Sequence, residues 1–202
     1  MPDARDPEPH PADRLDTEHQ VLLAVFDALD VECARVRSER ALRVPFWRDA
    51  IDFLFGFVIE VHQPRETIVF DAMAATGYPR KPGPITDAEA EHDDELELLE
   101  QLGAAVSAGD PVRVARAARN YTWCARAHVA REDQVVLAIA RQLLRGDAAA
   151  RTADEMARLH RDVIGTERLD TLLRLGRRLC ADAGIDFARR RTPTFDERAH
   201  RD

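Results

Sequence analysis

A histidine followed four positions later by a glutamate occurs twice in this chain, each time within an apolar stretch. The first pair is His62 and Glu66 in "HQPRET", and the second is His128 and Glu132 in "HVARED". A four-residue step on an α-helix places two side chains on the same face, one turn apart. Burying an unpaired carboxylate on such a face is very unfavourable. The repeated pair therefore predicts two helices that direct polar side chains into a shared, charge-compensated site.

Apolar residues at steps of three and four predict an all-α chain, and no strand-like alternation competes with this pattern. The breaker "GYPRKPGP" divides the chain into two halves, and each half is expected to form a helical hairpin. Thr86 and Glu89 form a capping box, and Asp110 before Pro111 marks another helix start. The expected fold is an up-down four-helix bundle with an additional C-terminal helix. The expected helices cover residues 15–38, 46–75, 86–109, 111–144 and 153–181.

The expected bundle occupies residues 15–145. Residues 1–14 contain four prolines among charged residues and are expected to form a flexible arm. An additional helix within residues 151–183 would cover one flank of the bundle. Residues 186–202 are expected to form a loose polar tail, from which Phe187 or Phe195 could dock.

The composition excludes several classes of partner. The net charge of −8 argues against nucleic acid or an anionic membrane surface as the main partner. No apolar run is long enough to span a bilayer, and the N-terminus has no signal-peptide organisation. The three cysteines are widely spaced, which argues against a disulfide framework. Reduced thiols would suit a cytoplasmic protein, and both a monomer and a homodimer are compatible with the sequence.

Two further histidines continue the pattern on the other expected helices. His19 and His92 each follow a glutamate, in Glu18-His19 and Glu91-His92, and lie in line with apolar residues. All these side chains would point into one bundle, where two divalent cations would compensate their charge. Imidazole and carboxylate together suit iron, manganese or zinc. The candidate metal ligands are His19, His62, Glu66, His92, His128 and Glu132.

This ordered set resembles that of the hemerythrin-like, or HHE cation-binding, domains, in which His and His-x-x-x-Glu elements alternate along the four helices. The resemblance implies a non-haem di-iron centre bridged by Glu66 and Glu132. It is to the four-histidine branch, because Ala88 and Leu96 stand where the oxygen-carrying hemerythrins have a fifth histidine. Asp133 has the spacing of the terminal aspartate of those carriers, but the repeat favours Glu132.

The ligand set leaves room for small molecules. After four histidines, two bridging carboxylates and an oxo or hydroxo bridge, two positions remain open on a pair of six-coordinate irons. Such a centre would bind O2, hydrogen peroxide or NO, which suggests a role in oxidative or nitrosative stress. Three alternatives stay open: an enzyme that consumes peroxide or NO, a sensor of O2 or redox state without turnover, and an iron donor for the repair of damaged iron–sulfur centres.

Several residues near the predicted ligands have both a functional and a structural interpretation. Tyr121 is the candidate catalytic residue, as a hydrogen-bond donor or electron relay, or else a core tyrosine. Cys124 is a redox-sensitive thiol or a small buried residue. His160 would be an extra ligand if the C-terminal helix reached the site. Glu95 or Asp94 would accept a hydrogen bond from a ligand histidine, or else lie on a solvated face.

Pro64 lies between His62 and Glu66 and departs from the regular helical pattern. It lacks the amide that would bond to the carbonyl of Glu60. We therefore expect a kink in the second helix beside the metal.

Overall fold

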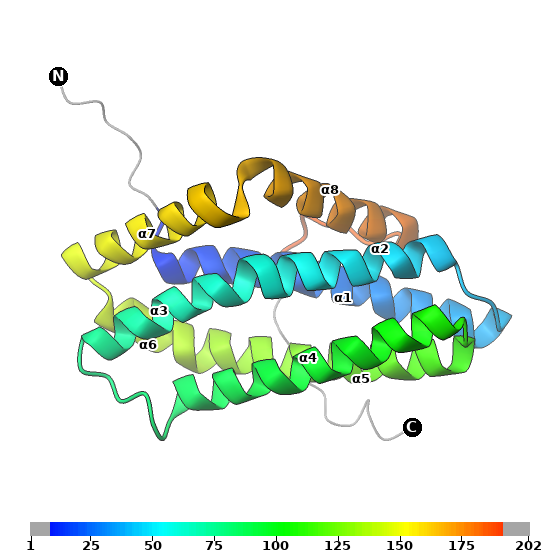
Figure 1. Cartoon of the computed structure of the whole chain (residues 1–202), viewed down its shortest axis with the longest axis horizontal. Helices are drawn as coiled ribbons and strands as arrows, with labels where there is room; N and C mark the ends of the chain where they lie inside the picture. Colours follow the sequence, from blue (N-terminus) through cyan, green and yellow to red (C-terminus); the bar gives the residue numbers. More distant parts are fainter. Residues whose placement is uncertain (1–8, 192–202) are drawn as a thin grey trace.

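The computed structural model describes residues 9–191, which form an antiparallel four-helix bundle with a helical pair along one side (Figure 1). The all-α expectation is confirmed, since residues 9–191 contain no strand. The first and third bundle helices are α1 and α4, and the second and fourth contain π-helical segments, labelled η. The bounds are α1 Pro11–Glu39; α2 Val44–Leu54, η1 Phe55–His62 and α3 Gln63–Ala75; α4 Pro84–Ala108; and α5 Pro111–Arg131, η2 Glu132–Val136 and α6 Leu137–Leu143.

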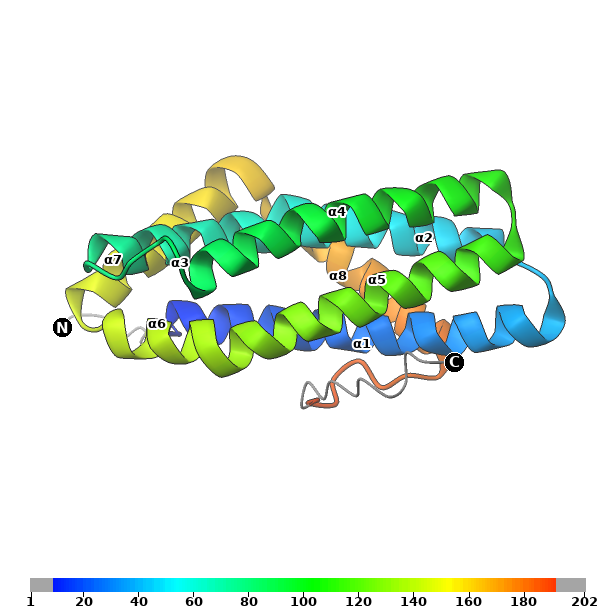
Figure 2. The ribbon, with the colours of Figure 1, turned by 90° about the horizontal axis from the view of Figure 1, so that it is seen from below.

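The C-terminal segment that was expected to be a single helix forms two. They are α7 (Asp147–Leu159), which continues into the π-helical η3 (His160–Ile164), and α8 (Thr166–Ala183). The break lies at Gly165, whose φ of 77° is in a region that glycine adopts without steric cost. Helices α7 and α8 pack on α1, α2 and α3 and so cover one flank of the bundle (Figures 1 and 2).

The expectation of a flexible arm is wrong for its last residues. Helix α1 begins at Pro11, whose fixed φ suits a first turn. His10 caps this helix, because its Nδ1 accepts a hydrogen bond from the amide of Ala12 at 3.1 Å. The other ring nitrogen of His10 donates to the carbonyl of Leu144 at 2.8 Å, which fixes the start of α1 against the end of α6. Residues 1–8 lie outside the described range.

The two predicted helix caps have different outcomes. Asp110 caps α5 as expected, since its Oδ1 accepts from the amides of Val112 and Arg113 at 3.0 and 3.1 Å. The prediction of a capping box at Thr86 is wrong. Helix α4 begins two residues earlier, at Pro84, and the Thr86 hydroxyl instead donates to the carbonyl of Arg80.

The π-helical segments change which residues face the core. An α-helical pattern through His128 and Glu132 predicts that Val135 points inward, yet its side chain is 40% exposed. Val136 and Ala140 are buried instead. The wider π-helical turn of η2 accounts for this shift of one residue. In the second helix, η1 ends at His62, two residues before Pro64, and α3 begins at Gln63. The kink expected beside the metal stays a prediction.

The core consists of two apolar clusters that lie on either side of the predicted ligands along the bundle. One cluster includes Leu22, Phe26 and Tyr121. The other includes Leu15 and Met73. Apolar layers therefore bound the polar ligand set at both ends.

The structure describes the C-terminal tail up to Arg191. Phe187 packs on the core as expected, and the guanidinium of Arg177 lies 5.3 Å from the centre of its ring. Phe195 and the rest of residues 192–202 lie outside the described range. Among the described helices, none is both long and apolar enough to cross a membrane.

Candidate metal centre

The bundle brings all the predicted ligand side chains together at its middle. His19 comes from α1, His62 from the end of η1, and Glu66 from the first turn of α3. His92, His128 and Glu132 come from α4, α5 and the start of η2. They form two overlapping groups, in each of which the candidate ligand atoms lie within 4.8 Å of one another. The groups are His19, His62, Glu66 and Glu132, and Glu66, His92, His128 and Glu132.

Each glutamate lies between histidines of both groups. Oε1 of Glu66 is 3.1 Å from Nε2 of His62, and Oε2 is 3.1 Å from Nε2 of His92. Oε2 of Glu132 is 3.3 Å from Nε2 of His19 and 3.4 Å from Nε2 of His128. Each carboxylate therefore lies close to one histidine from each group.

The inward-facing atoms of this cluster lack hydrogen-bond partners. Despite the short distances, both oxygens of Glu66 and of Glu132 are unpaired by hydrogen-bond geometry, as is Nε2 of His19, His62 and His92. Buried polar atoms are almost always paired, so this many orphaned acceptors require a further partner. A divalent cation fits, because imidazole nitrogen and carboxylate oxygen are typical ligands of iron, manganese and zinc.

The outer nitrogens of three histidines are held by carboxylates. Nδ1 of His19 donates to Asp133 at 2.7 Å, Nδ1 of His62 donates to Glu18 at 3.0 Å, and Nδ1 of His128 donates to Glu91 at 2.8 Å. This arrangement leaves Nε2 of each ring directed at the centre, as in metal sites where an outer carboxylate orients the ligand.

Neither Glu95 nor Asp94 has this orienting role. Asp94 is exposed, in agreement with the alternative of a solvated face, whereas Glu95 is buried and does not bond to a histidine. Glu18 and Glu91 were recognised only as part of a repeat. Each immediately precedes one ligand histidine yet bonds to a histidine on the neighbouring helix. The repeated Glu-His dipeptides therefore marked the orienting carboxylates. Their position in the sequence suggests that each glutamate bonds to the adjacent histidine, which is not the histidine that it contacts.

Burial and mutual charge together determine the protonation of the cluster. Burial alone lowers the pKa of His62, but Glu66 and Glu18 raise it to about 9. Burial likewise lowers the pKa of His128, and carboxylates led by Glu132 raise it to about 10. Burial and the adjacent Glu66 carboxylate raise the pKa of Glu132. In the absence of a cation, protons on the imidazoles thus offset the buried carboxylate charge.

A small cavity of about 10 Å³ adjoins the cluster. Such a volume holds about one molecule the size of water. The carboxyl of Glu95 and the hydroxyl of Tyr121 line it, and both carry a buried oxygen without a hydrogen-bond partner. Burial raises the pKa of both groups, which favours their neutral, hydrogen-bond-donating forms. The other lining residues are Leu22, Phe26, Val58, His62, Gln63, His92, Ala125, His128 and Val129.

Two other candidates lie outside the cluster. His160, in η3, belongs to neither ligand group, and its Nε2 is 3.2 Å from the hydroxyl of Thr166. It is therefore not an extra ligand in this arrangement. Cys124 is half-buried, and burial together with Glu95 and Asp94 raises its pKa to about 11.

Comparison with known proteins agrees with this geometry. Neither the curated proteins nor the solved structures provide a significant match to the chain. The hemerythrin HHE cation-binding domain does match, over residues 10–140, a range that ends within α6 and contains all six predicted ligands of the cluster. The chain therefore belongs to the hemerythrin HHE cation-binding family.

Proposed function

We propose that this protein is a non-haem di-iron protein of the four-histidine branch, which interacts with O2, peroxide or NO. His19 and His62 would hold one iron, and His92 and His128 the other, with Glu66 and Glu132 shared by both. When bound, the di-iron centre supplies electron exchange with the small molecule. The role that we propose is in oxidative or nitrosative stress.

The observation that carries this proposal is the pair of overlapping ligand groups that share both glutamates. One cation would leave the histidines of the other group beside an uncompensated carboxylate cluster. Two cations would satisfy the inward-facing oxygens of Glu66 and Glu132 together with the imidazoles. Iron is preferred to manganese or zinc because of the family resemblance, and a metal analysis distinguishes the three.

The surrounding side chains favour a small ligand. The adjoining cavity has room for about one water-sized molecule, and Leu22, Phe26 and Val58 give it an apolar wall. The hydroxyl of Tyr121 is an unpaired donor at that wall, and Oε1 of Glu95 is an unpaired buried oxygen beside it. They would orient O2, peroxide or NO by hydrogen bonding, and the apolar layers would exclude bulk water.

The test is to purify the protein without added metal and to measure bound metals and the optical spectrum. The same sample is then exposed to O2, hydrogen peroxide and NO. We expect about two irons per chain and absorption bands of a bridged di-iron centre. Catalytic loss of peroxide or NO would indicate an enzyme, a stable adduct would indicate a sensor or carrier, and iron transfer to an apo iron–sulfur protein would indicate a donor.

Two variants make this test specific. The double variant His62→Ala/His128→Ala removes one histidine from each group and should lose most bound metal. His160→Ala removes a histidine outside both groups and should retain metal content and spectrum. Equal metal content in all three proteins would contradict the proposed ligand set.

A further inference from the structure

The two halves of the chain place equivalent residues around the two ligand groups. In the first half, Nδ1 of His62 donates to Glu18, the residue before His19. In the second half, Nδ1 of His128 donates to Glu91, the residue before His92. The inner contacts follow this correspondence in part, since Glu66 approaches His62 and His92 as Glu132 approaches His128 and His19.

The correspondence between the halves fails clearly at Asp133. Asp133, the residue after Glu132, accepts from Nδ1 of His19 at 2.7 Å. Its counterpart, the residue after Glu66, is Thr67, which is exposed and donates its hydroxyl to the carbonyl of Gln63 at 3.0 Å. Within residues 9–191, Nδ1 of His92 consequently has no hydrogen-bond acceptor.

The supporting ion pairs are unequal as well. On the His62 side, Glu18 pairs with Arg65, whose side chain is only 4% exposed. On the His128 side, Glu91 pairs with Arg131, whose side chain is 53% exposed. Solvent screens the second pair and weakens it. The His92 side chain is itself 14% exposed, whereas that of His19 is fully buried.

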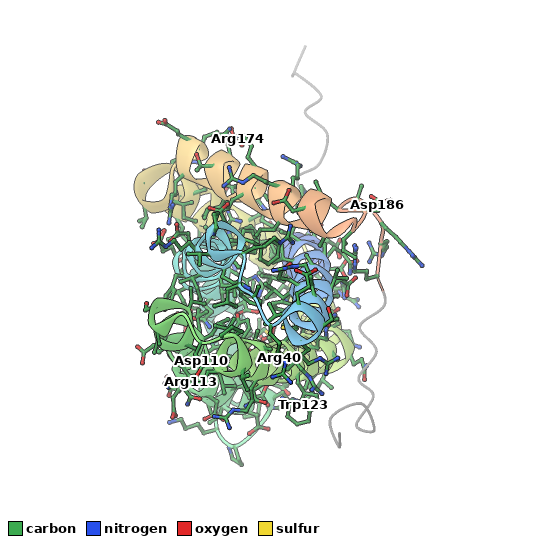
Figure 3. All side chains as sticks on the ribbon, turned by 90° about the vertical axis from the view of Figure 1, so that its right-hand side faces the viewer. Arg40, Asp110, Arg113, Trp123, Arg174 and Asp186 are labelled. Carbon is green, nitrogen blue, oxygen red and sulfur yellow. The ribbon has the colours of Figure 1, made fainter. Side chains whose placement is uncertain are left out.

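The C-terminal helices account for part of this difference. They pack on α1, α2 and α3. Seen end-on, α8 with Arg174 lies on the opposite side of the molecule from Asp110 and Arg113 at the start of α5 (Figure 3). The histidines of α4 and α5 therefore lie on the flank that lacks this cover.

From these differences we infer that the two metal positions are unequal, and that the metal beside His92 and His128 is the exchangeable one. This inference rests on the proposed function. An outer carboxylate fixes the ring orientation of a ligand histidine and raises its basicity, and its loss typically weakens metal binding about 10- to 100-fold. Because Thr67 stands where a carboxylate is needed, the metal position formed by His92 and His128 binds metal more weakly than the other.

The experiment measures metal release. Protein loaded anaerobically with Fe(II) is challenged with excess EDTA, and iron per chain is followed over time. We expect two phases of similar amplitude, with rates that differ about 10-fold or more. Thr67→Asp supplies the missing carboxylate and should slow the fast phase about 10-fold. Asp133→Thr should accelerate the slow phase.

The control is Thr171→Asp in α8. Thr171 is also an exposed helical threonine whose hydroxyl donates to the carbonyl four residues earlier, at 2.8 Å. The Thr171→Asp substitution adds the same charge away from the centre and should leave both phases of iron release unchanged. His92→Ala assigns the phases, since the fast phase should disappear while the slow one remains. Circular dichroism establishes that each variant is folded.

Several results would overturn the inference. Iron release from the unmodified protein in a single phase would do so. So would an unchanged fast phase in a folded Thr67→Asp protein, or a fast phase that persists in His92→Ala. Failure of the proposed function gives a different result, because the unmodified protein would then bind little iron at the start.

Discussion

Glu32 is a buried carboxylate remote from the metal centre, and it links α1 to the residue before α2. It accepts hydrogen bonds from Nε of Arg35 at 2.9 Å and Nε of Arg43 at 3.0 Å. Burial alone raises its pKa, but the two guanidinium groups lower it below its usual value. A carboxyl with a lowered folded-state pKa stabilises the fold above its unfolded-state pKa, and this contribution is lost as pH falls through the folded-state value.

We therefore expect Glu32→Gln to lower the free energy of unfolding by about 1–2 kcal/mol at pH 7, since both arginines are partly exposed to solvent. The difference from the unmodified protein should shrink below about pH 4.5, where carboxyls become protonated. Urea unfolding at pH 7 and pH 4 measures both values. Glu39→Gln is the control, because Glu39 also pairs with Arg35 but is mostly exposed. An equal loss in both variants would show that burial of Glu32 has no role.

The reactivity of Cys124 distinguishes its two interpretations, a small buried residue and a redox-sensitive thiol. Its pKa of about 11 leaves very little thiolate at neutral pH. We expect native Cys124 to react with iodoacetamide at pH 7.5 on the order of 100-fold more slowly than in the urea-unfolded protein, because the thiolate is the reactive form. Peptide mass spectrometry after timed alkylation gives the rate at this site. Rapid alkylation of the native protein would favour the redox thiol instead.

The ligand set itself was accessible from the sequence because its residue types are costly to bury and recur at helical spacing. The outer carboxylates were not, because their partners lie on other helices. Asp133 illustrates this limit. Its spacing from His128 suggested a relation to that residue, but the structure pairs it with His19 on α1. Contacts between helices depend on their rotation, which sequence periodicity determines only approximately.

At the scale of elements, periodicity predicted the bundle but not its irregular turns. An α-helical period predicts that Val135 faces the core. The π-helical turn of η2 is wider, and the side chain of Val135 is exposed instead. The break between α7 and α8 depends on the backbone conformation of Gly165. A lone glycine in an amphipathic segment is compatible with a continuous helix, so the sequence predicted one helix where two form.

Gly56 in η1 marks a close approach between the bundle and α8. A Cβ added there would lie 2.5 Å from Cδ2 of the buried Leu172 and 2.7 Å from the guanidinium of Arg168. Overpacking of this kind costs about 1–3 kcal/mol, whereas alanine gains about 1 kcal/mol over glycine in a helix. We expect Gly56→Ala to lower the free energy of unfolding by about 1 kcal/mol and to increase amide hydrogen exchange in α8.

Gly103 in α4 provides the matched substitution. Apart from the adjacent residues and the backbone of α4 itself, no heavy atom lies within 4 Å of a Cβ added there, so Gly103→Ala should stabilise the protein by up to about 1 kcal/mol. Urea unfolding of both variants tests the difference in sign. If both alanines stabilise the protein equally, α8 is not held closely against η1.

For the molecule as a whole, the centre joins all four bundle helices between two apolar clusters. Folding without metal buries Glu66 and Glu132 among imidazoles that must carry the compensating protons. The pKa values of His62 and His128, about 9 and 10, lie above the usual value of 6.5. Groups with raised folded-state pKa values stabilise the fold below their unfolded-state pKa. This contribution is lost as pH rises through the folded-state values.

The metal-free protein should therefore lose stability as pH rises from about 6.5 to about 10. The metal-loaded protein should lose much less, because bound cations replace those protons and do not leave as pH increases within this range. Thermal denaturation of both forms between pH 6 and pH 9.5 measures the widening gap. A His62→Ala/His128→Ala protein should show a weaker pH dependence, because His19 is then the one ligand imidazole that keeps a clearly raised pKa. A metal-free protein whose midpoint stays constant over that range would show that protons do not compensate the buried carboxylates, and that the helices tolerate the empty centre by opening to water.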